Sequence, residues 1–264
     1  MTTRFDALPS SLRAHAQLEQ FGSVPVLLAR PEPASDPPPL LVWLHGRTAN
    51  KELDPGRYLR CIRSGIAVCA MDLPGHGDRS DIALQTPERV IDVVLQAAGE
   101  IDEVTLAAID RLGADPSRVA LGGMSAGGMA SIARLLRPHR FAAACLEATS
   151  GDWASLPMAS HASGPAHERI IANDPVTHLK SWRAIPLLAI HAQLDQWIPM
   201  QPQWRFLDAI AAMGSSSLIE RVVYDRTGAP GEHAGFGSHA ADAKAAQIEF
   251  LRRHFLIENG VAQS

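Results

Sequence analysis

The stretch Gly122-Gly123-Met124-Ser125-Ala126-Gly127-Gly128 places a single serine among small residues. An apolar segment precedes it at 118–121, and a helix-forming segment follows it at 129–137. A strand that turns abruptly into a helix strains the backbone of the corner residue, and larger side chains at 123 or 127 would collide with the turn. The pattern G-x-S-x-G therefore predicts a nucleophile elbow with Ser125 exposed at the corner. The pattern G-x-S-x-G arises by chance in roughly one chain of this length in ten, so the pattern alone is weak evidence. The motifs elsewhere in the chain determine how strongly it supports a nucleophile elbow.

Short apolar segments recur on both sides of this elbow and alternate with helix-like segments. The expected strands lie at 24–29, 40–44, 66–71, 119–122, 141–148, 185–191 and 218–224. The expected helices lie at 86–111, 129–137 and 240–256. Strands that alternate with helices predict an α/β protein with a mostly parallel sheet and helices on both faces.

Length and composition narrow the class of protein. The 264 residues, 46% of them hydrophobic and 20% charged, suit one domain over residues 1–264 with a large core. The net charge of −4 and the lack of any basic face argue against nucleic acid and anionic membranes as partners. Three cysteines give no paired disulfide framework, residues 1–12 have no apolar signal core, and no apolar run is long enough to cross a membrane. We therefore expect a soluble, cytoplasmic protein with buried, reduced cysteines.

Two further residues complete a candidate catalytic set with Ser125. A serine hydroxyl becomes an effective nucleophile only when a base accepts its proton and an acid orients that base. Asp195 follows the expected strand at 185–191, and His233 lies in a glycine-rich loop at 227–237, just before the last helix. The chain order Ser, Asp, His is the order of an α/β-hydrolase triad.

Three other residues stay open as alternatives for these roles. His239 could serve as the base instead of His233, although it lies at the expected start of the closing helix. Glu147 or Asp152 could supply the acid, because this architecture can also place its carboxylate after the preceding strand. Loop position favours His233 and Asp195.

With these motifs in this order, the chain resembles the α/β-hydrolase family. It is most similar to small single-domain serine esterases related to dienelactone hydrolases and to the catalytic domains of prolyl-oligopeptidase-like enzymes. The resemblance extends from about Val24 onward and implies the α/β-hydrolase fold, with a sheet of about eight strands. It rests on Leu44-His45-Gly46-Arg47, on Asp72-Leu73-Pro74-Gly75-His76-Gly77, on the elbow, on Asp195 with Ile198-Pro199, and on His233 with Phe236.

Two departures from the named relatives favour a general esterase. Dienelactone hydrolases proper are expected to use a cysteine nucleophile, and here the position is Ser125. The β-propeller of the oligopeptidases is not expected, since fewer than 50 residues precede the first motif.

The resemblance also implies an oxyanion hole, that is, fixed N–H donors for the charge that develops on the attacked carbonyl oxygen. One donor is expected to be the backbone N–H of Ala126, at the start of a helix. The other is expected to be the backbone N–H of Arg47, after the strand at 40–44.

The segment 149–180 is the candidate lid or pocket wall. It carries several glycines and prolines between two expected core strands, and long structureless loops are uncommon in compact domains. The aromatic residues Trp153, Trp197 and Phe236 are candidates for the substrate pocket.

The sequence thus predicts a serine hydrolase that cleaves carboxylic esters, with lactones and thioesters as further candidates. The alternatives are a small peptidase or acyltransferase with the same triad, or an inactive binding protein on the same fold. The reaction needs no cofactor, and a metal site is not expected because His161, His167 and His178 lack partners at zinc-ligand spacing. We expect a small-molecule ester as the partner, with a monomer and a homodimer both open.

Overall fold

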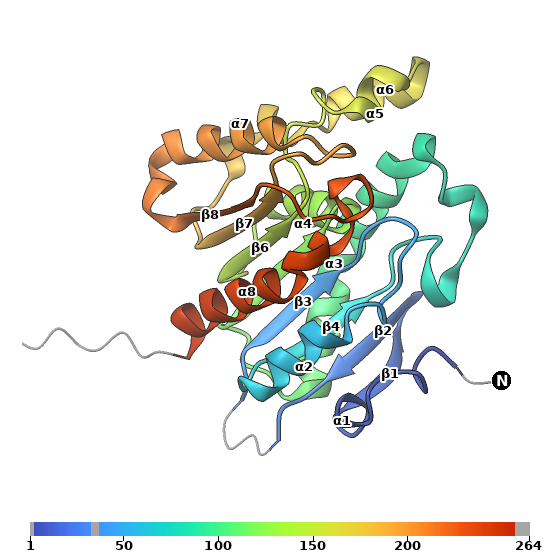
Figure 1. The fold of residues 1–264 in the computed structure, drawn as a ribbon, viewed down its shortest axis with the longest axis vertical. Helices are drawn as coiled ribbons and strands as arrows, with labels where there is room; N and C mark the ends of the chain where they lie inside the picture. Colours follow the sequence, from blue (N-terminus) through green and yellow to red (C-terminus); the bar gives the residue numbers. More distant parts are fainter. Residues whose placement is uncertain (1–2, 33–36, 257–264) are drawn as a thin grey trace, which may run out of the picture.

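The computed structural model describes residues 3–32 and 37–256, and its central feature is an eight-stranded sheet (Figure 1). The strand order is β1-β2-β4-β3-β5-β6-β7-β8. Strand β2 runs antiparallel to both of its neighbours, whereas every other adjacent pair is parallel. The strands are β1 (Ala16–Phe21), β2 (Val24–Ala29), β3 (Leu40–Leu44), β4 (Ala67–Met71), β5 (Val119–Met124), β6 (Ala143–Glu147), β7 (Leu187–Ala192) and β8 (Ile219–Tyr224). The expected mostly parallel sheet of the α/β-hydrolase fold is confirmed.

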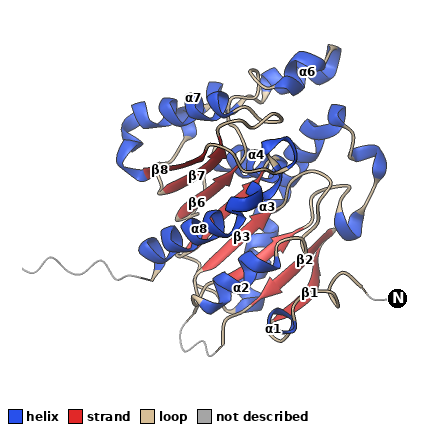
Figure 2. Ribbon diagram, in the orientation of Figure 1, coloured by secondary structure: helices blue, strands red, loops and turns tan. Residues whose placement is uncertain are grey.

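Helices cover both faces of the sheet (Figure 2). They are α1 (Ser10–Arg13), α2 (Pro55–Arg63), α3 (Val90–Leu112), α4 (Ala126–Leu135), α5 (Pro157–His161), α6 (Gly164–Ala172), α7 (Met200–Ile210) and α8 (Ala240–Phe255). Helices α3, α4 and α7 share one apolar core with the sheet, and α1, α2 and α8 share the other.

The central strands are buried on both sides, which explains their continuous apolar sequences. In β3, Leu40, Val42 and Leu44 point into the core under α3 and α4, whereas Leu41 and Trp43 point into the core under α2 and α8. Successive side chains of a strand point to opposite faces, so a sheet covered twice needs apolar residues at every position.

Several elements were not expected from the sequence, among them β1, α2 and α7. Strand β1 lies at the edge of the sheet and has no fully buried position, and its three apolar residues do not form a continuous run. Helices α2 and α7 bury only one stripe each, such as Tyr58, Cys61 and Ile62 in α2. A stripe of this kind is a weaker sequence signal than a fully buried strand.

The segment between β6 and β7 leaves the sheet and returns to it. Its base is fixed, because Gln203 of α7 accepts a hydrogen bond from the Gly151 N–H at 3.1 Å, and Asp174 accepts one from the Trp153 N–H at 2.8 Å. Its middle forms α5 and α6, which lie beyond the carboxyl ends of the strands (Figure 1).

Candidate active site

Ser125 occupies the sharp turn between β5 and α4. Its φ of 54° and ψ of −120° are unusual for a residue with a side chain, and such a conformation costs about 1–3 kcal/mol. The glycines beside it are required by close packing. A Cβ atom at Gly123 would lie 2.4 Å from the Gly127 carbonyl carbon, and one at Gly127 would lie 2.3 Å from the Leu44 carbonyl oxygen. The expected reason for small residues at 123 and 127 therefore has direct geometric support.

Asp195 and His233, 38 positions apart in the chain, are joined by a hydrogen bond. His233 Nδ1 lies 2.7 Å from Asp195 Oδ2, and both side chains are buried. The other carboxylate oxygen, Oδ1, accepts the backbone N–H groups of Trp197 at 2.9 Å and Ile198 at 2.8 Å. Asp195 is therefore held as an acceptor, and the bond to Nδ1 leaves Nε2 of His233 available as a base.

Further contacts lock the two loops that carry these residues. The Gln196 N–H donates to the Gly231 carbonyl at 2.9 Å, which ties the loop of Asp195 to the loop of His233. The Trp197 ring packs against the His233 ring, with 4.9 Å between centroids. Burial lowers the pKa of His191, and its Nε2 lies 2.8 Å from the Ile198 carbonyl oxygen. This contact helps to hold the loop that carries Asp195 in place.

Ser125 and His233 line one cavity of about 760 Å³. Among the described residues, no hydrogen bond joins the Ser125 hydroxyl to the His233 ring. Catalytic hydrogen bonds are often long in ligand-free enzymes and shorten when the substrate is bound. The structure thus brings the three sequence-predicted residues to one site, with the Asp–His bond formed and the serine beside the ring in the same cavity.

The segment 45–47 packs directly against the elbow. A Cβ atom at Gly46 would meet the Ser125 Cβ at 3.3 Å. Within residues 3–32 and 37–256, neither the Arg47 N–H nor the Ala126 N–H donates a hydrogen bond. Two unpartnered amides next to a serine are the donor set that an oxyanion hole requires.

The alternative acid and base residues have other partners. Glu147 makes a two-pronged ion pair with Arg57 at 2.7 and 2.8 Å, and the guanidinium lies 3.8 Å from the centroid of the Trp43 ring. Burial alone would lower the pKa of Arg57, but the Glu147 carboxylate raises it above its ordinary value. Asp152 accepts from Arg205 at 2.8 Å, and His239 stacks on Tyr224.

The three aromatic candidates have different positions. Trp197, 55% exposed, and Phe236, fully buried, both line the cavity. Trp153, expected as a pocket residue, lies instead in the core, and its Nε1 donates to the Ser150 carbonyl at 2.8 Å. The backbone N–H of Trp153 donates to Asp174 at 2.8 Å, and the indole does not line the cavity.

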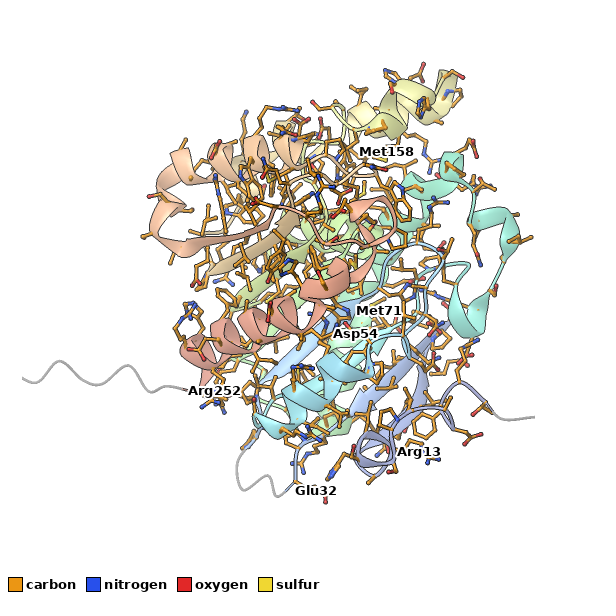
Figure 3. All side chains as sticks on the ribbon, in the orientation of Figure 1. Arg13, Glu32, Asp54, Met71, Met158 and Arg252 are labelled. Atoms are coloured by element: carbon orange, nitrogen blue, oxygen red, sulfur yellow. The ribbon has the colours of Figure 1, made fainter. Side chains whose placement is uncertain are left out.

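The cavity has further walls that sequence reasoning missed. One wall is apolar and includes Val90 from α3 with Leu156 and Met158 from the segment between β6 and β7. Another is polar and includes Asp54 and Lys244, which lie 3.4 Å apart. Figure 3 shows Asp54 at the end of α2 that approaches α8. No sequence motif marks these residues, because they come from elements far apart in the chain.

The motif at 72–77 anchors the loop after β3. Asp72 accepts hydrogen bonds from the Lys51 N–H at 2.8 Å, from Lys51 Nζ at 3.1 Å and from the Asp78 N–H at 2.9 Å. Burial alone would raise the pKa of Asp72, but the N–H groups of Asp78 and Lys51 and the Lys51 ammonium group lower it to about 2. Its role is structural, as expected for a residue that satisfies local backbone donors.

Across residues 3–32 and 37–256, no three His, Cys, Asp or Glu side chains are arranged to hold a metal ion. None of the helices in this part of the chain has the length and apolar character needed to cross a membrane. The three cysteines are free and buried, and burial raises the pKa of Cys61 to about 12.

Solved structures with similar folds include both esterases and peptidases. TT1662 from Thermus thermophilus is 24% identical, with 92% of this chain and 99% of that chain covered and a TM-score of 0.72. Esterase 2 of Thermogutta terrifontis is 19% identical, with 95% and 98% covered and a TM-score of 0.70. A puromycin-hydrolyzing peptidase of Mycobacterium tuberculosis is 19% identical, with 96% and 41% covered and a TM-score of 0.74. This chain therefore spans about two fifths of that peptidase.

No curated protein sequence matches the chain. Residues 92–257, more than half of the 264, match the prolyl oligopeptidase family (Peptidase_S9), and this stretch contains Ser125, Asp195 and His233. The chain therefore belongs to the prolyl oligopeptidase family and is a serine hydrolase with the α/β-hydrolase fold.

Proposed function

We propose that the protein hydrolyses carboxylic esters through an acyl-enzyme on Ser125. The observation that carries the proposal is the 2.7 Å bond between Asp195 and His233 in the cavity where Ser125 stands at a strained elbow. An ester needs less from such a site than an amide does, because resonance stabilises its carbonyl group less and because an alkoxide is a better leaving group than an amide anion.

In the proposed first step, His233 Nε2 removes the Ser125 hydroxyl proton as the oxygen attacks the ester carbonyl. Asp195 keeps the imidazole in the tautomer that has Nδ1 protonated and stabilises the imidazolium that forms. His233 then returns the proton to the leaving alcohol, and water resolves the acyl-enzyme by the same route in reverse.

The oxyanion is proposed to bind the N–H groups of Ala126 and Arg47. Both amides lack partners in the part of the chain that the structure describes, and Ala126 begins helix α4, whose dipole favours negative charge at this end. Removal of one such donor typically costs about 3–4 kcal/mol of transition-state stabilisation.

The segment 149–180 is proposed to act as a wall of the substrate pocket in a domain that spans residues 1–264. Leu156, Met158 and His161 of this segment line the cavity. The apolar side chains among them suit an aliphatic acyl or alcohol group of a small ester.

The test is ester hydrolysis with a panel of p-nitrophenyl esters of rising chain length. Ser125→Ala is expected to reduce turnover to background and to abolish fluorophosphonate labelling, with an unchanged fold by circular dichroism. Asp195→Asn is expected to lower kcat by about 10⁴-fold, because an amide cannot hold the required His tautomer. Full activity in Ser125→Ala would overturn the proposal.

A peptidase is the second candidate, favoured by the family to which residues 92–257 belong. Matched p-nitrophenyl ester and p-nitroanilide substrates with the same acyl group separate the two. Comparable kcat/KM values for the pair would favour a peptidase, whereas hydrolysis of the ester alone would favour an esterase.

A further inference from the structure

The two peptide groups that carry the proposed oxyanion donors share one arrangement. In each, a buried side chain contacts the carbonyl oxygen from the side opposite the donor. Thr149 Oγ1 donates to the Ser125 carbonyl at 2.8 Å, behind the Ala126 N–H. His45 Nδ1 lies 2.7 Å from the Gly46 carbonyl oxygen, behind the Arg47 N–H.

The geometry of a peptide group connects these contacts to the oxyanion hole. In a trans peptide the C=O and N–H bonds point in opposite directions in one rigid plane. A hydrogen bond that fixes the carbonyl of Ser125 therefore also fixes the direction of the Ala126 N–H. The same bond polarises the peptide and strengthens its N–H as a donor.

Thr149 is itself held firmly in this position. It is fully buried, and a Cβ atom at Gly128 would come within 2.6 Å of the Thr149 Cβ, so the threonine fills the space beside the elbow. The preceding Ala148 has a positive φ of 43°, and its N–H donates to the Ile190 carbonyl of β7 at 2.9 Å. The end of β6 thus bends sharply to bring the hydroxyl onto the Ser125 carbonyl.

His45 provides the parallel case on the other donor. The Leu73 N–H donates to His45 Nε2 at 3.1 Å, which requires that nitrogen to be unprotonated. In the neutral ring the proton then resides on Nδ1, which donates to the Gly46 carbonyl. Both proposed donors thus belong to peptides whose carbonyl accepts from a buried side chain.

We propose that Thr149 is a positioning residue that aims and polarises the Ala126 N–H toward the oxyanion. The inference rests on the proposed function. In its first step the Ser125 oxygen forms a bond to the carbonyl carbon of the ester, and the π electron pair of that carbonyl moves to its oxygen. The serine proton passes to His233. Thr149 touches none of the reacting atoms and acts through the Ser125–Ala126 peptide.

The test compares Thr149→Val with Thr149→Ser. Valine keeps the Cγ2 methyl group beside Gly128 and replaces the hydroxyl with a second methyl group. The Ser125 carbonyl keeps its 2.9 Å bond from the Met129 N–H, so we expect the fold to be preserved. We expect Thr149→Val to lower kcat for a p-nitrophenyl ester about 10- to 100-fold, with KM within twofold of the wild type. This loss is smaller than the loss in kcat on complete removal of an oxyanion donor, because the Ala126 N–H is still present. Thr149→Ser is expected to stay within threefold of the wild type.

A second measurement separates positioning from a structural role. A trifluoromethyl ketone forms a hemiketal oxyanion on Ser125, so its inhibition constant should weaken in Thr149→Val by the factor by which kcat/KM falls. Thermal unfolding checks that both variants remain folded.

Two results would overturn the inference. One is a Thr149→Val enzyme with wild-type kcat while Ser125→Ala is inactive, and the other is an equal loss in Thr149→Ser and Thr149→Val. Failure of the proposed function gives a different result from failure of this inference. In that case Ser125→Ala would retain activity, or the wild type would form no adduct at Ser125. Either result would also remove the basis of this inference.

Discussion

Two regions border the same cavity and are built in opposite ways. The strand-end platform, formed by residues 44–47, 122–128 and 147–149, is closely packed, and a Cβ atom added at Gly122, Gly123 or Gly127 would lie within 2.6 Å of other backbone atoms. The α5–α6 segment, residues 157–172, buries only Ala159 and Ile170 of its two helices. Figure 1 shows this segment beyond the ends of the strands, away from the packed core.

From this difference we propose separate tasks for the two regions. A strained elbow and two aimed amides persist only where surrounding atoms leave no room for relaxation. A wall that must adapt to a substrate can be less tightly packed, since elements with few buried contacts open at low cost in free energy. We expect changes that crowd the glycines of the platform to alter catalysis and stability together, and changes in the segment to alter substrate preference alone.

The largest effect is expected from Gly127→Ala in the platform. The new Cβ would lie 2.3 Å from the Leu44 carbonyl oxygen and 2.4 Å from the His45 carbonyl oxygen, so the backbone must shift. The gain in helix propensity of about 1 kcal/mol cannot offset an overpacking cost of about 3 kcal/mol or more. Urea unfolding should show the net loss of stability, and ester hydrolysis should fall with it.

Gly99→Ala in α3 is the matched control. Nothing lies within 4 Å of the Cβ that it would add, and its φ is not positive. We expect this variant to be more stable by about 0.5–1 kcal/mol with unchanged activity. Equal stability of the two variants would contradict the contrast between a packed platform and an open surface.

A smaller effect is expected from Asp72→Asn, which weakens the anchor of the loop after β3. The pKa of Asp72 is lowered from 3.8 to about 2 in the folded protein. A carboxyl of this kind stabilises the fold above its unfolded pKa, and the contribution disappears as the pH falls through the folded value. At pH 7 the variant should be less stable by about 2 kcal/mol.

The pH dependence distinguishes this charge effect from simple loss of packing. The difference between wild type and Asp72→Asn, measured by urea unfolding, should shrink as the pH falls from 3.8 toward about 2. Asp225→Asn, at an exposed position, serves as the control and should change stability by less than about 0.5 kcal/mol. A difference that is constant with pH would refute the charge interpretation.

The smallest effect on stability is expected from Met158→Ala in the α5–α6 segment. Met158 lines the cavity, and Figure 3 marks it where this segment approaches the rest of the molecule. Truncation should shift preference toward longer p-nitrophenyl esters by about 1 kcal/mol in relative kcat/KM. Met213→Ala, outside the cavity and 49% exposed, should leave the chain-length profile unchanged.

The sequence was most informative where a residue is constrained by its immediate neighbours. The expected strands at 24–29 and 40–44 match β2 and β3 residue for residue. In an α/β chain a short continuous apolar run is typical of a strand that is buried on both faces. The elbow was equally visible, because Ser125 needs glycines at fixed spacing. The edge strand β1 was not predicted, since it pairs with the sheet on one side only and its apolar residues do not form a continuous run.

Contacts between distant parts of the chain were beyond sequence reasoning. Arg57 and Glu147 are 90 positions apart and meet in the core, so neither alone suggests an ion pair rather than an acid for the triad. Trp153 was expected in the pocket on residue type, but it packs in the core with side chains from distant parts of the chain. Thr149 is an ordinary residue in the sequence, and only its contact with the Ser125 carbonyl gives it a role.

The sequence by itself determined the fold and the order of Ser125, Asp195 and His233, because periodicity and turn chemistry are local properties of a chain. Only the tertiary structure decided which groups meet: the 2.7 Å bond between Asp195 and His233, the walls of the cavity and the hydroxyl behind the elbow. The physical reason is that hydrogen bonds and packing act over a few ångströms in space, whatever the separation along the chain.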